Sequence, residues 1–269
     1  MAEAGKLEGK VAIVTGAGSQ EGDGYGIGKA ISLTLAREGA TVVLVDQFED
    51  RANVTLAEVE KEGGKGSVIV ADLSDRSSIK GIVDETVSRH GRLDVLVNNA
   101  AISATVSLLD TTPELYDRVI AVNLTAPFFL TQAAIPALAE SGGGSIVHIT
   151  SIAATRGTGG TGQAAYAASK SGLFGLMIDN ADVYGKLGEQ GIRINCVSPG
   201  IVDTPMRQAA MRQVGLEPGS INLGEKTSLG FEGDAWDIAR AVLFLAGPDG
   251  RFVSGVHIPI DGGTTARSH

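Results

Sequence analysis

The sequence predicts an α/β fold in which about seven parallel strands form one doubly wound sheet with helices on both faces. Short apolar runs rich in valine and isoleucine alternate along the chain with longer segments of helical spacing. The apolar runs are continuous rather than alternating, as expected for strands that helices cover on both sides. No composition shift or linker divides the 269 residues, so one Rossmann-like domain over residues 1–269 is expected.

Seven short segments have the composition of buried strands, and six longer ones have helical spacing. The predicted strands cover residues 11–15, 41–45, 67–71, 93–97, 145–150, 192–197 and 256–260. The predicted helices cover residues 26–38, 54–62, 77–90, 113–139, 166–187 and 234–246. Thr112 and Pro113 mark the start of the fourth helix, because a hydroxyl caps a helix and proline suits its first position.

The composition is that of an acidic chain with a large core. Hydrophobic residues make up 43% and charged residues 20%, and the formal net charge is -9. A nucleic-acid or anionic-membrane surface would need a basic stripe, so neither partner is expected. Residues 1–10 carry no signal-peptide stretch and no run is expected to span a membrane, so a cytoplasmic protein is predicted. The single cysteine, Cys196, lies in an apolar run and is interpreted as buried packing.

Chemically distinctive residues follow six of the predicted strands, at the edge where an open parallel sheet binds its ligands. They are Gly16 to Gly28, Asp46, Asp72, Asn98 with Asn99, Ser151, and Pro199 with Gly200. Because these separate placements agree, a site at this edge is predicted.

A glycine-rich loop begins at Gly16, and Gly26 with Ile27 opens the helix that follows it. Glycines let the backbone approach a pyrophosphate, and the helix N-terminus offers it free N–H groups and a partial positive charge. Such loops often serve only as tight turns. The position after the first strand favours a dinucleotide site.

Asp46 stands where the second strand ends, so its carboxylate can accept hydrogen bonds from both ribose hydroxyls of adenosine. The same carboxylate would repel the extra phosphate of NADP. No arginine or lysine stands beside it, since Gln47 and Phe48 follow and Arg51 is five residues on. NAD is therefore the predicted cofactor, and a surface turn is the alternative interpretation.

Tyr166 and Lys170 lie four residues apart on a predicted helix, so both project from one face. A tyrosine pKa near 10 must fall by roughly three units for base catalysis near pH 7, about 4 kcal/mol. An ammonium at about 4 Å supplies on the order of 4 kcal/mol at an effective dielectric of 20. Burial acts the other way, so the positive nicotinamide ring is expected to help. Alone, such a pair also fits packing and surface charge.

In combination these residues resemble the short-chain dehydrogenase/reductase family over residues 6–263. The matching stretches are Thr15-Gly16 with Gly26-Ile27-Gly28, Asp72-Leu73, Asn98-Asn99-Ala100, Asn123, Ser151, Tyr166-Ala-Ala-Ser-Lys170, Pro199-Gly200 and Asp261-Gly262-Gly263.

The resemblance implies a catalytic role for four side chains. Tyr166 would be the general acid/base, Lys170 would lower its pKa and hold the nicotinamide ribose, and Ser151 would position the substrate oxygen. The family residue that matches Asn123 anchors a water for proton relay. Pro127 has no N–H and so frees the carbonyl of Asn123 to hold that water, with a simple proline kink as the alternative.

The resemblance also implies cofactor contacts. Asp72 and Leu73 would border the adenine, Asn98 and Ala100 would line the ribose side, and Thr204 would touch the nicotinamide amide. The full expected set is Gly16, Gly26, Ile27, Asp46, Asp72, Leu73, Asn98, Ala100, Tyr166, Lys170, Pro199, Gly200 and Thr204. No metal site is predicted.

Two departures from the family pattern stand out. The glycine loop is longer than usual, and the extra residues 19–25 carry Glu21 and Asp23, which are expected to point away from a pyrophosphate. Ala101 replaces the glycine that commonly ends the Asn-Asn-Ala-Gly motif.

The predicted function is NAD-dependent interconversion of a secondary alcohol and a ketone by hydride transfer. A lyase or epimerase with tightly bound NAD, and a non-catalytic NAD-binding protein, are the alternatives. Residues 204–231 are predicted to form an apolar lid over the substrate, or else a packed peripheral helix. Arg156 could pair with a substrate carboxylate or lie on the surface. The resemblance further implies a homotetramer built through the helices that contain Asn123 and Tyr166.

Overall fold

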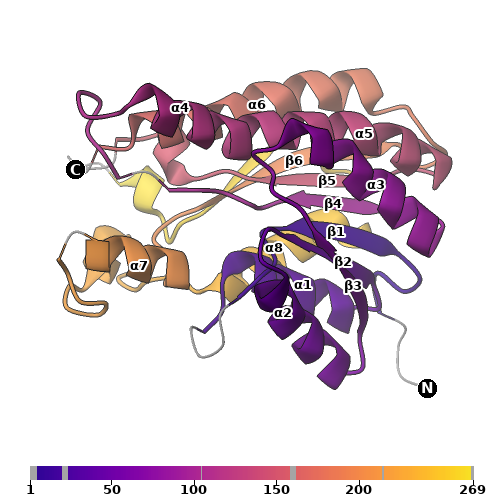
Figure 1. Ribbon diagram of the computed structural model, residues 1–269, viewed down its shortest axis with the longest axis horizontal. Coiled ribbons are helices and arrows are strands. Elements are labelled where there is room, and N and C mark those ends of the chain that lie inside the picture. The colour runs from indigo at the N-terminus through magenta and orange to yellow at the C-terminus, as the bar shows by residue number, and fades with distance from the viewer. Residues whose placement is uncertain (1–4, 20–23, 104, 158–161, 214, 268–269) are drawn as a thin grey trace.

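Seven parallel strands form one sheet in the order β3-β2-β1-β4-β5-β6-β7, as predicted. The computed structural model describes residues 5–19, 24–103, 105–157, 162–213 and 215–267 (Figure 1). The strands are β1 Val11–Thr15, β2 Thr41–Asp46, β3 Lys65–Val70, β4 Val95–Asn98, β5 Gly144–Ile149, β6 Ile192–Pro199 and β7 His257–Ile260. The order reverses between β1 and β4, which is where such sheets bind ligands.

Helices cover both faces of the sheet (Figure 1). They are α1 Ile27–Arg37, α2 Glu49–Lys61, α3 Arg76–His90, α4 Pro113–Ile120, α5 Ala126–Glu140, α6 Ala164–Tyr184, α7 Pro205–Gln213 and α8 Ala235–Ala246. Alternate strand residues point to opposite faces. Val14 and Val42 pack in the core under α1 and α8, whereas Ile13 and Val43 pack in the core under α3 and α5.

The predicted long helix over residues 113–139 is divided into three parts. A π-helical turn, Ala121–Thr125, separates α4 from α5, and the N–H of Ala126 donates to the carbonyl of Ala121, five residues earlier. Pro127 follows at once and cannot make the ordinary helical bond to the carbonyl of Asn123, so the wider turn falls where an α-helical bond is lost.

The segment Pro113–Glu140 is long and apolar enough to cross a membrane, which corrects the expectation that no run approaches that length. Half of its most apolar window is buried inside the fold. Leu130, Ala134 and Leu138 are fully buried against the sheet. Its apolar character therefore belongs to a core helix of this sheet.

The connection at residues 204–231 contains a peripheral helix, which was one of the two interpretations of its sequence. It holds α7 and a 3-10 turn, Leu223–Lys226. Figure 1 shows α7 set apart from the body of the sheet. Arg207 on this helix donates to Asp203 at 2.8 Å and to Glu232 at 2.5 Å, so ionic contacts fasten α7 to the segment before α8.

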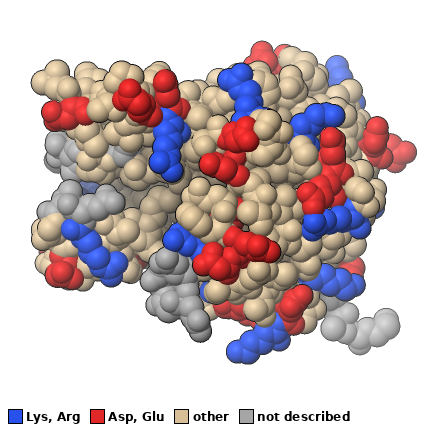
Figure 2. Space-filling view, in the orientation of Figure 1, with Lys and Arg blue, Asp and Glu red and all other residues tan. Residues whose placement is uncertain are grey.

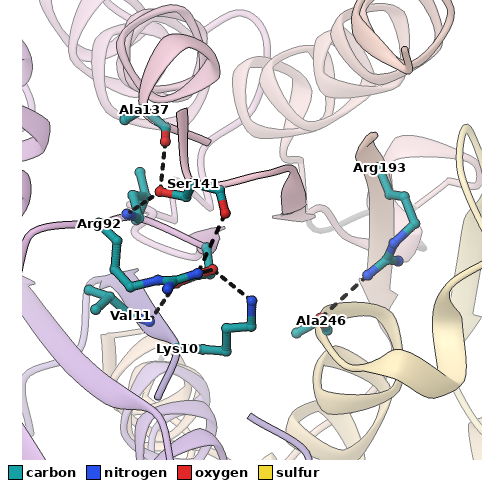
Figure 3. A network of polar contacts seen from close by, with 9 residues as sticks. Lys10, Val11, Arg92, Ala137, Ser141, Arg193 and Ala246 are labelled. Atoms are coloured by element: carbon teal, nitrogen blue, oxygen red, sulfur yellow. Dashed lines mark hydrogen bonds and ion pairs between the residues drawn. The ribbon is translucent and has the colours of Figure 1, made fainter. Parts of the chain in front are cut away.

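Asp94, which directly precedes β4, forms a polar network with Lys10, Val11 and Arg92 at the amino-terminal edge of the sheet. Figure 3 shows these three partners of Asp94. Its carboxylate accepts from Arg92 at 2.7 and 2.6 Å, from Lys10 at 3.0 Å and from the N–H of Val11 at 3.0 Å. The backbone N–H of Ser145 in turn donates to the carbonyl of Asp94 at 3.0 Å. These contacts join the starts of β1, β4 and β5.

Acidic and basic side chains are interspersed over the face that Figure 2 displays. They do not gather there into a basic stripe.

Arg193 of β6 is partly buried and donates to backbone carbonyls, among them those of Ala246 and Gly250 near the end of α8 (Figure 3).

Candidate active site

A cavity of about 720 Å³ opens at the carboxyl ends of the strands. Its wall combines the loops that follow β1, β2, β4 and β5 with residues of α6 and α7. In Figure 2 the surface is hollowed between the upper part of the molecule and the part that α7 forms. Its volume falls in the usual range of ligand pockets, roughly 300–1,000 Å³.

The glycine loop after β1 is shaped for close approach. Gly16 has φ +63°, and a Cβ there would lie 2.8 Å from the Cα of Ala100. A Cβ on Gly28 would lie 2.1 Å from the carbonyl oxygen of Gly16. Gly26 caps α1 without a side chain, so the first N–H groups of the helix can receive an anion. Gly16, Gly26 and Ile27 all line the cavity, and these observations fit a dinucleotide pyrophosphate.

Asp46 lines the cavity at the end of β2, where its carboxylate is held by the backbone. It accepts from the N–H of Gly18 at 2.9 Å and from the N–H of Phe48 at 3.1 Å. These bonds fix the carboxylate and leave it lone pairs for a ribose hydroxyl.

Arg51 also lines this part of the cavity, which corrects the view that no cation stands near Asp46. Its guanidinium lies over the ring of Phe48, 4.2 Å from the centroid. The predicted helix begins at residue 54, but α2 begins at Glu49. Its first turn brings Arg51 back toward the end of β2.

The predicted adenosine-side residues Asp72, Leu73 and Ala100 line the cavity, but Asn98 does not. The side chain of Asn98 is buried and lies 3.1 Å from Nδ1 of His148. Asn99, which follows it, lines the cavity instead and donates to the carbonyls of Thr15 and Gly16. The end of β4 explains the exchange, because Asn98 is the last residue inside the sheet and Asn99 begins the loop that lines the cavity.

Ser151, Tyr166 and Lys170 meet in the middle of the cavity wall. Lys170 is buried, its Nζ donates to the carbonyl of Ile149 at 2.8 Å, and it lies 5.8 Å from the centroid of the Tyr166 ring. The two side chains therefore project from one face of α6, as the spacing predicts.

The pKa values at this site reflect burial first. Burial raises the pKa of Tyr166, and the hydrogen bond with Ser151 offsets only part of that rise. Burial lowers the pKa of Lys170 to about 8. The expected lowering of the Tyr166 pKa by Lys170 is not found. The Lys170 ammonium donates to the carbonyl of Ile149 instead.

Asn123 lies outside the cavity lining, fully buried in the π-helical turn. Its amide accepts from the N–H of Ile102 at 2.9 Å and donates to the carbonyl of the same residue at 3.0 Å. It also donates to the hydroxyl of Ser169 on α6 at 3.2 Å. Asn123 thus joins the loop after β4 to the helix that carries Tyr166.

Pro199, Gly200 and Thr204, which were predicted to contact the cofactor, line the cavity together with residues of α7. A Cβ on Gly200 would lie 2.4 Å from the Cα of Asp261, so glycine is required there. Arg156 does not line the cavity, because it donates to the carbonyl of Thr264 and ties its loop to the C-terminal segment.

His148 of β5 is a buried core residue, and only one of its ring nitrogens has a partner among the described residues. Burial, reinforced by nearby Lys170, lowers its pKa to about 3, so the ring is neutral. Glu21 and Asp23, which were expected to point outward, lie outside the described residues.

The comparisons with known proteins agree with this site. A family model described as Enoyl-(Acyl carrier protein) reductase matches residues 22–265. The 3-oxoacyl-[acyl-carrier-protein] reductase of Thermotoga maritima is 38% identical over 261 residues, which cover 96% of this chain and 98% of that protein.

Two of the similar solved structures carry nicotinamide dinucleotides. Carveol dehydrogenase from Mycobacterium avium, in complex with NAD, is 29% identical with a TM-score of 0.88 and covers 98% of this chain and 100% of its own. A short chain dehydrogenase from Burkholderia cenocepacia, in complex with NADP, is 34% identical with a TM-score of 0.83 and covers 97% and 99%. The chain belongs to the short-chain dehydrogenase/reductase family and is an NAD(P)-dependent oxidoreductase.

Proposed function

We propose that the chain interconverts a secondary alcohol and a ketone with NAD(H), and that Tyr166 moves the proton. The observation that carries this proposal is the meeting of Ser151, Tyr166 and Lys170 in the same cavity as the glycine-rich start of α1. One end of the cavity suits a dinucleotide and the other end a small substrate, with the three polar side chains between them.

Each side chain has a physical task in this reaction. Ser151 orients the substrate oxygen and already hydrogen bonds with Tyr166. The phenol of Tyr166 receives a proton from an alcohol or gives one to a ketone, and Lys170 supplies the positive charge that favours the phenolate. Asn123 positions α6, and its backbone carbonyl is proposed to hold a relay water. Bound cofactor supplies the nicotinamide that accepts or donates the hydride.

The test is NADH absorbance against a panel of secondary alcohols and ketones. Tyr166→Phe should lower turnover by roughly 10²- to 10⁴-fold, the usual contribution of general acid–base catalysis. Tyr116→Phe removes an exposed phenol from α4 and serves as the matched control. Wild-type turnover in Tyr166→Phe would contradict the proton-transfer role. Cofactor that stays bound through purification without net redox turnover would favour a lyase or epimerase instead.

We propose NAD rather than NADP as the preferred cofactor, because the backbone fixes the Asp46 carboxylate at the end of β2. Arg51 beside Phe48 is the feature that would favour the extra phosphate of NADP. Thermal shifts with NADH and NADPH compare the two, since a ligand at 100 times its Kd adds about 2.7 kcal/mol. Greater stabilisation by NADPH that is lost in Arg51→Ala would overturn the preference.

The proposed lid is the connection at residues 204–231, because α7 supplies a wall of the proposed substrate end of the cavity.

The proposed assembly is a homotetramer through α5 and α6. Phe128 on α5 and Ile178 and Val183 on α6 are exposed apolar side chains that a partner would cover. Sedimentation velocity tests the assembly, and a monomer at micromolar concentration would contradict it. Cell fractionation tests the proposed cytoplasmic location.

A further inference from the structure

The long glycine loop is fastened at both described ends to one helix, α2. Before residues 20–23, the N–H of Ser19 donates to the carbonyl of Arg51 at 3.1 Å. After them, the hydroxyl of Tyr25 donates to a carboxylate oxygen of Glu58 at 2.7 Å. The loop that precedes α1 is therefore anchored beside the adenosine end of the cavity.

Tyr25 is held by more than its hydroxyl. Its ring lies 4.9 Å from the ring of Trp236 on α8, and the Nζ of Lys29 lies 4.9 Å from its centroid. Lys29 in turn pairs with Glu58 at 2.7 Å, and its side chain is only 8% exposed. These four residues, Tyr25, Lys29, Glu58 and Trp236, form what we name the loop clasp, and they come from the loop, α1, α2 and α8.

The charges of the loop clasp are matched. The hydrogen bond to Glu58 raises the pKa of Tyr25, so the phenol remains a donor. Burial acts to raise the pKa of Glu58, but the bonds from Lys29 and Tyr25 outweigh it and lower that pKa. Glu58 therefore stays ionised between its two donors.

The residue next to Tyr25 is Gly26, the cap of α1 and part of the cavity wall. A Cβ on Gly26 would meet no atom within 4 Å, so no packing against the rest of the chain would fix a side chain there. Its position depends on its two chain neighbours: Ile27 packs against the hydrophobic core, and Tyr25 is held by the loop clasp. Because α1 receives the pyrophosphate through its first N–H groups, the placement of Gly26 affects how well the cofactor is bound.

We propose that Tyr25 is a positioning residue that, through the loop clasp, holds Gly26 and the start of α1 in place for the dinucleotide. Tyr25 does not line the cavity, so it acts through its neighbours rather than by touching the ligand. Holding Tyr25 and Gly26 in place in advance removes part of the entropy that binding would otherwise cost. This inference rests on the proposed dinucleotide site, and it concerns affinity rather than the chemical step.

The test is the Kd for NADH and the separate values of KM and kcat in Tyr25→Phe, Tyr25→Ala and Glu58→Gln. Loss of the phenol hydroxyl should raise the Kd and the KM for NADH about five- to tenfold, within the range for the loss of one typical hydrogen bond. Tyr25→Ala should raise them further, and kcat at saturating NADH should stay within about twofold. Tyr116→Phe is the matched control, because it removes an exposed phenol from α4, which supplies no residue of the loop clasp.

Trp236 is the single tryptophan of the chain, so its fluorescence reports on the loop clasp directly. Tyr25→Ala should change the emission of the cofactor-free protein, whereas Tyr25→Phe keeps the ring contact and should change it little. Melting of the cofactor-free variants separates affinity from folding. A lowered Tm with an unchanged Kd for NADH would show a purely structural clasp and overturn the inference.

Failure of the inference can be told apart from failure of the proposed function. If the wild-type protein binds neither NADH nor NADPH, the dinucleotide site itself is wrong. If the wild type binds NADH and both Tyr25 variants bind it equally well, only the role of Tyr25 is overturned.

Discussion

Lys170 carries its charge in an unusual setting. Its side chain is buried, its ammonium donates to the carbonyl of Ile149, and no carboxylate among the described residues pairs with it. Burial lowers its pKa to about 8. Lys170 therefore loses its positive charge as the pH rises through about 8, close to physiological pH.

We expect kcat/KM for NADH in ketone reduction to fall as the pH rises through about 8, because kcat/KM for the cofactor reports the free enzyme. Below that pH Lys170 is charged and Tyr166, whose pKa burial raises, keeps its proton. In Lys170→Arg the charge persists, so whatever activity remains should show this fall at higher pH. A wild-type profile that stays level well above pH 8 would contradict the prediction.

At the residue scale the sequence predicted the places of Tyr166 and Lys170 better than those of Asn98 and Arg51. Tyr166 and Lys170 share a helix, and their spacing alone places them on one face. The places of Asn98 and Arg51 were misjudged, since they depend on where β4 ends and on where α2 begins. Neither follows from hydrophobic spacing.

At the scale of the elements, the position of α7 depends on the side chain of Arg207. Arg207 contacts both Asp203 and Glu232, and its Nε is buried without a partner among the described residues. Glu232 also accepts from the N–H of Leu223 at 3.1 Å, which links α7 to the rest of the connection. These contacts hold α7, the proposed substrate wall of the cavity, in position.

Arg207→Ala should raise the KM for the alcohol or ketone about fivefold or more, a loss of roughly 1 kcal/mol or more, and leave the Kd for NADH unchanged. Glu232→Gln removes the ion pair between Arg207 and Glu232 and should also raise the KM for the alcohol or ketone. Arg240→Ala breaks an exposed pair with Asp237 on α8 and is the control. A change in the Kd for NADH as large as the change in KM would contradict a role confined to the substrate wall. Steady-state kinetics and NADH titration give both values.

Most elements could be predicted from their apolar residues, which form continuous runs in the strands and recur with helical spacing in the helices. The continuous apolar runs located all seven strands to within a few residues. The helix α7 lacks such a run, since Met206 is exposed while Met211 is buried and the helix stands apart from the sheet. The π-helical turn is also hidden from periodicity, and only Pro127 signals it.

In the whole molecule, the ionic network and the chemistry lie at opposite edges of the sheet. Asp94 joins three strands at the amino-terminal edge, with a side chain only 4% exposed, while the cavity opens at the other edge. Burial alone would raise its pKa, but hydrogen bonds from Arg92, Val11 and Lys10 outweigh burial and lower it. The folded state therefore favours the ionised form.

Asp94→Asn should lower the free energy of unfolding by about 1–3 kcal/mol near pH 7. Because the folded pKa lies below the ordinary value of 3.8, this stabilisation is present above about pH 4 and is lost as the pH falls through the folded pKa. The difference between variant and wild type should therefore shrink in acid. Urea unfolding across pH measures it.

Asp84→Asn, at an exposed pair with Lys80, is the control and should change stability by less than about 0.5 kcal/mol. An equal gap between Asp94→Asn and wild type at every pH would show that ionisation of Asp94 does not stabilise the fold.

The burial of Cys196 makes the chain suitable for site-specific labelling. It is the one cysteine in the sequence, it is inaccessible, and burial raises its pKa to about 12, so thiol reagents should leave it unmodified. Ala209→Cys on α7 would then introduce the sole reactive thiol of the molecule. A spin label or fluorophore attached there would follow the motion of this helix in real time while the native sequence elsewhere is kept.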